Sequence, residues 1–207
     1  MGCAWGKFHD PVWLNNRATE VLEEFQTTFA LMGPSHGGLA SQDTWQPLSP
    51  LIFKLNFDAT LFSAIKSSGF GVVIRNEKGE VMAAMAAKSP EVSSSEEVEF
   101  LACQKAIEFA IDVGFFELVI EGDNSSVMKV VSALQDDFSL LGNVVGDIHH
   151  LVRNLQWVRI ECTRRGGNRV AHELAHFPRN ISQDLYWMED VPPIVREALY
   201  QDVDFSN

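Results

Sequence analysis

The chain has 207 residues, of which 46% are hydrophobic, so it is long and apolar enough for one domain with a core and is not a generally disordered protein. Its formal net charge of -12 argues against a nucleic-acid partner, because phosphate binding needs clustered lysine and arginine. The distribution of charge along the chain weakens this objection. Residues 1–50 and 179–207 both hold more acidic than basic side chains and carry much of the excess negative charge.

The sequence also bears on the compartment. No run of 18 apolar residues occurs, and residues 1–10 lack the basic start and apolar stretch of a signal peptide. Three scattered cysteines are too few for a disulfide framework or a CxxC metal site. We therefore expect an intracellular monomer of the nucleus or cytoplasm, which is not secreted and has no membrane partner.

The N-terminal part, residues 1–44, is expected to precede the main domain. Between residues 17 and 32 the apolar side chains recur at a one-sided helical spacing, which predicts a helix that docks on the main domain or on a partner. Residues 33–44 are rich in glycine, serine and proline and form the predicted linker. We place the main domain at residues 45–178 and a C-terminal extension at residues 179–207.

The main domain opens with three predicted strands. Residues 52–58 alternate between apolar and polar side chains, which indicates a strand packed on one side with Asp58 at its carboxyl end. Residues 69–75 and 80–88 are the next two strands, joined by a turn at 76–79 that ends in glycine. Short links between sequential strands predict an antiparallel meander.

Helices and strands then alternate. We predict a helix at 94–113, a strand at 116–121, helices at 124–134 and 140–155, a strand at 157–163, and a helix at 168–177 stopped by Pro178. This order predicts an α/β fold with a mixed five-stranded sheet, three strands antiparallel and two parallel, covered by helices. Asp58 and Asp123, which follows the fourth strand, would then lie at the same edge of the sheet.

A third carboxylate is predicted to converge there. Glu99 falls within the apolar face of helix 94–113, where a carboxylate is costly unless it is paired or bound to metal. Two alternatives stay open: Glu99 reaches solvent near the helix start, and Asp123 caps the following helix. A cluster of Asp58, Glu99 and Asp123 would offer hard oxygen ligands, which suit Mg²⁺ or Mn²⁺ better than zinc.

A series of motifs carries a family resemblance: KLNFDA, GFGVVIRNEKGEVMAA, EFLACQKAIEFA, VIEGDNSSV and RRGGNRVAHELA. Together they resemble the RNase H-like domain that occurs in plants, at the end of non-LTR retroelement reverse transcriptases and in stand-alone proteins. The match covers about residues 45–178. The resemblance implies an RNase H-like fold and a retrotransposon-derived domain.

The resemblance also implies an activity. The family's three carboxylates fall on Asp58, Glu99 and Asp123, and its fourth acidic position falls on His172, so these four are the expected catalytic residues. Asp58, Glu99 and Asp123 would bind Mg²⁺ or Mn²⁺, and two-metal hydrolysis would cleave the RNA strand of an RNA–DNA hybrid.

Three positions depart from the retroviral and bacterial RNases H. His172 replaces a carboxylate and adds no negative charge for a second Mg²⁺. Cys162 stands at the place of a loop histidine, and Ala59 stands at the place of the usual glycine. The alternative function is therefore a nucleic-acid or protein-binding module of the same fold, weak or inactive in cleavage.

Basic residues flank the predicted site. Arg164, Arg165 and Arg169 form the densest basic group of the main domain and are expected to contact phosphates, with Asn168 of the same segment as a further substrate-binding residue. The other interpretation is an ordinary solvated charge cluster.

The segment from His172 to His176 spells HExxH, the zinc metalloprotease motif. Both histidines would lie on one helical face, but the extended motif with a third ligand downstream is absent, because residues 177–179 break the helix. This remote alternative predicts tightly bound zinc.

Overall fold

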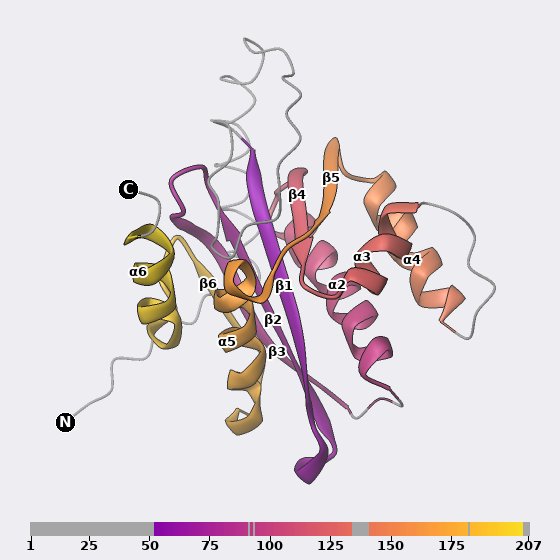
Figure 1. Cartoon of the computed structure of the whole chain (residues 1–207), viewed down its shortest axis with the longest axis horizontal. Helices are drawn as coiled ribbons and strands as arrows, with labels where there is room; N and C mark the ends of the chain where they lie inside the picture. Colours follow the sequence, from indigo (N-terminus) through magenta and orange to yellow (C-terminus); the bar gives the residue numbers. More distant parts are fainter. Residues whose placement is uncertain (1–51, 91, 93, 134–140, 182, 205–207) are drawn as a thin grey trace.

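The computed structural model describes residues 52–204 apart from residues 91, 93, 134–140 and 182, and this part is a six-stranded sheet with helices on both faces (Figure 1). The strands are β1 (Phe53–Phe62), β2 (Ser67–Arg75), β3 (Val81–Pro90), β4 (Glu117–Gly122), β5 (Trp157–Cys162) and β6 (Leu185–Met188). The α-helices are α2 (Ser95–Asp112), α3 (Ser125–Ala133), α4 (Gly142–Arg153), α5 (Arg169–His176) and α6 (Arg196–Asp204). Short 3-10 helices are η1 (Ser63–Ile65), η2 (Arg165–Asn168), η3 (Phe177–Asn180) and η4 (Pro193–Val195).

The strand order β5-β4-β1-β2-β3-β6 confirms the predicted antiparallel meander of β1, β2 and β3 and the parallel pairing of β1 with β4. The predicted strand count was one too low, because β6 pairs with the outer side of β3. This strand has four residues and lies in the segment that we expected to be only a C-terminal extension. So short a run does not show a recognisable alternation. The N-terminal helix and linker predicted before residue 45 lie outside the described residues.

The ends of the other elements agree with the local sequence signals. Ser94 caps α2 by accepting a hydrogen bond from the Glu97 backbone amide. Gly114 after this helix and Gly79 in the β2–β3 turn both have positive φ, 89° and 78°, a conformation that glycine adopts without steric cost at a helix end or in a tight turn. Within the described ranges no helix is both long and apolar enough to cross a membrane.

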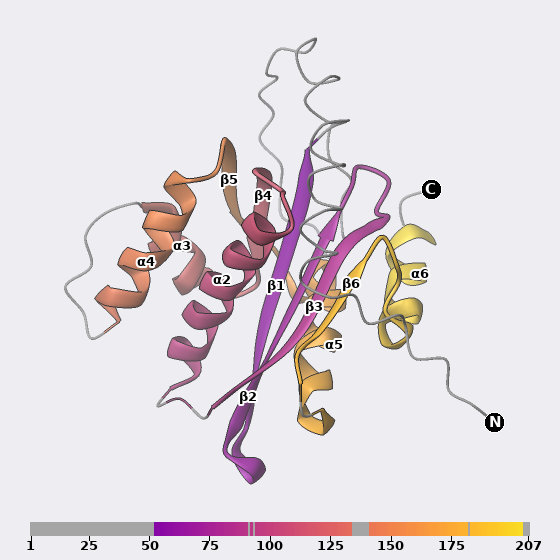
Figure 2. The same ribbon diagram turned by 180° about the vertical axis from the view of Figure 1, so that it is seen from behind.

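Helices α2, α3 and α4 cover one face of the sheet, and α5 and α6 cover the other (Figures 1 and 2). The prediction that β1 packs on one side only was wrong. Lys54, Asn56 and Asp58, on its polar face, are buried as deeply as the apolar residues between them. The reason is that α5 packs across this face of β1, where Lys54 pairs with Glu121 of β4 and Asp58 contacts His172 of α5. Helix α6, from the C-terminal extension, lies on the same face of the sheet, and its Asp202 pairs with Arg75 of β2.

Strand β1 also runs further than predicted, because β2 pairs with it as far as Phe62. Its parallel pairing with β4 stops earlier, at Asn56 opposite Glu121. Asp58 therefore lies within a strand, two residues beyond the last parallel pair, and not at the carboxyl end of that strand.

Glycines on β2 allow α5 to lie directly against the sheet. A Cβ atom at Gly71 would be 2.1 Å from the Ala171 carbonyl oxygen and 2.3 Å from the Ala175 amide nitrogen. A Cβ atom at Gly69 would be 2.1 Å from the Ala175 carbonyl oxygen. This close approach fixes the distance of α5 from β1, which pairs with β2.

We expect Gly71→Ala to destabilise the protein by about 1–3 kcal/mol, because the added methyl group overpacks a contact with helix backbone that cannot rotate away. The matched control is Gly146→Ala on α4, where a Cβ atom meets nothing within 4 Å. That substitution should stabilise the helix by about 0.5–1 kcal/mol. Urea denaturation of both variants measures the two effects, and equal effects would contradict the close packing of α5.

Candidate metal centre

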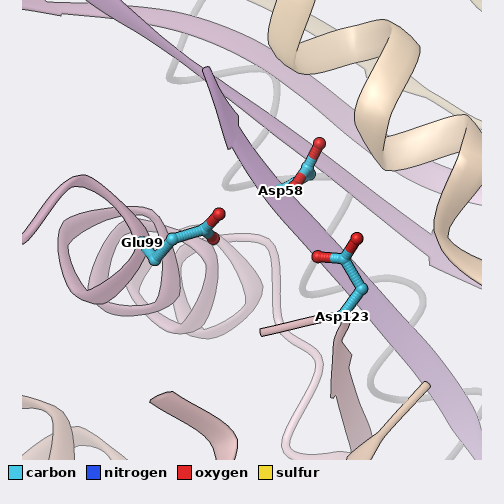
Figure 3. A group of neighbouring side chains, drawn as sticks. All are labelled: Asp58, Glu99 and Asp123. Carbon is cyan, nitrogen blue, oxygen red and sulfur yellow. The ribbon is translucent and has the colours of Figure 1, made fainter. Parts of the chain in front are cut away.

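Asp58, Glu99 and Asp123 point toward one another from three different elements (Figure 3). One carboxylate oxygen of each lies within 4.8 Å of the others. Asp58 comes from β1, Glu99 from the second turn of α2, and Asp123 from the residue that follows β4. The predicted convergence of these three carboxylates is confirmed, while their role as metal ligands stays a prediction.

The local structure explains why two alternatives do not apply. Glu99 points to the two aspartates and not out to solvent (Figure 3). At the start of α3, the cap is made by Asn124, whose side-chain oxygen accepts hydrogen bonds from the amides of Ser126 and Val127 at 3.2 and 3.3 Å. Asp123 is therefore free of the capping role and its carboxylate is available at the cluster.

The electrostatics of the cluster favour a bound cation. Burial, and then the charges of Asp58 and Asp123, raise the pKa of Glu99 to about 8. Burial and the charge of Asp58 also raise the pKa of Asp123, although Arg165 opposes this shift. Three neighbouring carboxylates repel one another when all are ionised. They fit a hard divalent ion such as Mg²⁺ or Mn²⁺, whose positive charge would remove the repulsion.

His172, the expected fourth catalytic residue, lies at the edge of this cluster on α5. Its Nδ1 atom is 2.6 Å from the Oδ2 atom of Asp58, and its side chain is 57% exposed. The hydrogen bond to Asp58 raises the pKa of His172, and burial opposes that shift. The imidazole thus holds the Asp58 carboxylate in place and keeps part of its ring accessible to a ligand.

The predicted substrate-binding residues separate into two groups. Arg165 is 96% exposed, with its Nε atom 3.7 Å from the Oδ2 atom of Asp123. Arg164 is also exposed, and Arg169 is an exposed residue of α5 that contacts Glu173 and Gln201. Asn168 is only 1% exposed, so its predicted contact with substrate needs correction: its amide donates a hydrogen bond to the Phe57 carbonyl oxygen at 2.8 Å. It ties the start of α5 to the strand beside Asp58.

Cys162 lies at the end of β5, opposite Gly122 and near the cluster. Burial and then the charges of Asp123 and Glu121 raise the pKa of its thiol. The side chain therefore stays protonated at neutral pH and does not supply the proton acceptor that a histidine would offer at this position.

The HExxH residues lack a complete zinc site in the described part of the chain. The rings of His172 and His176 are 4.5 Å apart, but His172 already binds Asp58 and Glu173 pairs with Arg169. Among the described residues, the only group of three or more metal-binding side chains is Asp58, Glu99 and Asp123. No third ligand for the histidine pair is present there.

Sequence reasoning missed a layer of buried polar residues beside the cluster. These residues are Lys54, Asn56, Arg75, Glu121 and Asp202. Two signals pointed to part of this layer. Lys54 and Asn56 alternate with apolar residues and therefore lie on the same side of β1 as Asp58, and Glu121 comes two residues before Asp123. Nothing in the sequence pattern pairs Arg75 with Asp202.

Comparisons with solved structures identify the fold. RNase H1 from the halophilic archaeon Halobacterium salinarum is 21% identical, with a TM-score of 0.55 over 60% of this chain and 95% of that one. The N-terminal RNase H domain of a Mycobacterium tuberculosis protein, solved as a fusion with maltose-binding protein, is 16% identical with a TM-score of 0.54 over 61% and 91%. LC11-RNase H1, solved in complex with an RNA/DNA hybrid, is 19% identical with a TM-score of 0.53 over 60% and 94%.

At these identities the likeness shows the fold alone, and that fold is RNase H-like. No curated protein matches the sequence. Residues 56–177, which are more than half of the chain and include all three clustered carboxylates, match the family described as reverse transcriptase-like. The chain therefore belongs to the reverse transcriptase-like family.

Proposed function

We propose that this protein is a metal-dependent nuclease that cleaves the RNA strand of RNA–DNA hybrids. The observation that carries the proposal is the cluster of Asp58, Glu99 and Asp123 on an RNase H-like fold, with its oxygens within 4.8 Å. One similar structure, LC11-RNase H1, was solved with an RNA/DNA hybrid, which supports the same class of substrate here.

The three carboxylates would hold Mg²⁺ or Mn²⁺. When bound, the metal would polarise the phosphate to be cleaved and make a bound water molecule give up its proton more readily. His172 keeps the Asp58 carboxylate oriented through its 2.6 Å contact, and its exposed ring can take or return a proton beside the cluster. Arg165 next to Asp123, with Arg164 and Arg169, would contact the phosphates of the substrate.

A second function is a module of the same fold that binds nucleic acid or protein without cleaving. The observation that favours it is the contact of His172 with Asp58, which takes up one oxygen of a metal-binding carboxylate where other RNases H are expected to have a fourth acid. Metal binding without cleavage would distinguish this module from the nuclease.

The direct test is to incubate the protein with Mn²⁺ and an RNA–DNA hybrid labelled on the RNA strand. We expect cleavage, and we expect Asp58→Asn to abolish both the cleavage and the rise in melting temperature caused by Mn²⁺. The matched control is Asp147→Asn, the same change at an exposed position of α4. Stabilisation by Mn²⁺ without cleavage would favour the binding module. Absence of both stabilisation and cleavage would refute a metal centre.

The raised pKa of Glu99 predicts a pH dependence of stability in EDTA. Since its folded pKa of about 8 exceeds the ordinary 4.5, the proton on Glu99 stabilises the fold fully below about pH 4.5 and this contribution is lost as the pH rises through about 8. Metal-free thermal stability should therefore fall over this interval, and Glu99→Gln should flatten the fall. Glu96→Gln, at an exposed position of the same helix, is the control and should keep the wild-type slope.

A carboxylate in place of His172 should strengthen the metal site. We expect His172→Asp to bind Mn²⁺ more tightly than the wild type and to cleave hybrids faster, because a fourth negative charge faces the same cluster. The same charge should lower the melting temperature in EDTA. His172→Asn separates the loss of the imidazole from the gain of charge. Tight zinc binding that is lost in both variants would instead support the metalloprotease alternative.

A further inference from the structure

Five polar side chains form a connected layer beside the cluster, which we call the buried clamp: Lys54, Asn56, Arg75, Glu121 and Asp202. Each is at most 6% exposed. They come from four elements, β1, β2, β4 and α6. Two positive and two negative charges in this layer balance one another, which burial requires.

The first part of the clamp joins the two strands that carry the aspartates. Asn56 on β1 lies opposite Glu121 on β4 in the last pair of their parallel ladder, and its side-chain amide donates to the Glu121 Oε2 atom at 2.9 Å. The Lys54 Nζ atom lies 2.8 Å from the other Glu121 oxygen. Asp58 follows Asn56 by two residues in the chain, and Asp123 follows Glu121 by two residues, just after the end of β4.

The second part links this pair to α6. Arg75 donates from Nη2 to the Asn56 side-chain oxygen at 3.0 Å and from Nη1 to the Asp202 Oδ2 atom at 2.6 Å. Asp202 lies 127 residues after Arg75 in the chain and outside residues 56–177, which match the family. A helix beyond the family match thus supplies the counter-charge for the centre of the clamp.

We infer that Asp202, acting through Arg75 and Asn56, is a positioning residue that holds Asp58 and Asp123 at the separation needed for metal binding. The like charges of these aspartates push β1 and β4 apart directly beyond their last paired residues, and the clamp joins the strands at that pair. A buried Arg75 that loses Asp202 has to find another partner, which disturbs Asn56. The inference rests on the proposed function, since it takes the cluster to be a metal site.

Three variants of the full chain separate positioning from simple stability. Asp202→Asn removes the charge that faces Arg75. Arg75→Met combined with Asp202→Leu replaces the ion pair by apolar groups of similar size, which often restores stability, but it also removes the hydrogen bond to Asn56. Leu199→Ala, at a buried apolar position of the same helix, weakens the packing of α6 and leaves the five clamp side chains unchanged.

Three quantities are measured for each variant: the melting temperature in EDTA, the Mn²⁺ affinity by calorimetry, and the NMR amide shifts of Asp58 and Asp123 without metal. We expect Asp202→Asn to lose stability and to bind Mn²⁺ about tenfold more weakly. This is the lower end of the loss caused by removing a residue bonded directly to a metal ligand, because Asp202 acts only through Arg75 and Asn56. The double variant should regain stability but keep the weak Mn²⁺ binding. Leu199→Ala should lose stability and keep wild-type affinity.

Wild-type Mn²⁺ affinity in both clamp variants would overturn the inference and leave the proposed function intact. Absence of Mn²⁺ binding in the wild type would instead refute the proposed function. In that case the amide shifts decide the coupling: changes at Asp58 and Asp123 that are larger in both clamp variants than in Leu199→Ala support it, and equal or smaller changes refute it.

Discussion

Three carboxylates with oxygens within 4.8 Å repel one another strongly when no cation lies between them, and the surrounding fold has to hold them there. The structure reduces this repulsion in several ways. Glu99 has a pKa of about 8 and so keeps its proton at neutral pH. His172 lies beside Asp58, and Arg165 lies beside Asp123. A cluster that is maintained against its own charge is prepared for a cation, since binding one relieves strain that the folded protein already bears.

Much of the fold followed from local patterns. Alternation located β1, and turn signals and apolar runs located the other predicted strands. Helical spacing located α2 with Glu99 on its inner face, and the order of elements placed Asp58 and Asp123 at the ends of parallel neighbours. These features depend on residues close in sequence, and the meander leaves few topologies open. The convergence of the three carboxylates was predictable for that reason.

The remainder depended on contacts between distant residues. The alternation of β1 shows that its two faces differ, but it does not show that α5 will cover the polar face. Nor does it show that α6 will supply Asp202 as the partner of Arg75 on the neighbouring strand β2. Asparagine is common in surface loops, and only the folded structure shows that the Asn168 side chain is buried and bonded to the Phe57 carbonyl oxygen of β1. Strand β6 forms because β3 offers a free edge for pairing, and the four residues of β6 alone do not indicate a strand.

The distance along the chain between the members of the buried clamp has a consequence for biosynthesis. Domains begin to fold while the ribosome is still adding residues, and β1, β2, β4 and α5 are all made before Asp202. Until α6 emerges, the Arg75 guanidinium lacks the carboxylate that it pairs with in the finished structure. Final closure of this layer therefore waits for a late segment, so a nascent or prematurely terminated product has the three acidic residues in its sequence without the full set of contacts beside them.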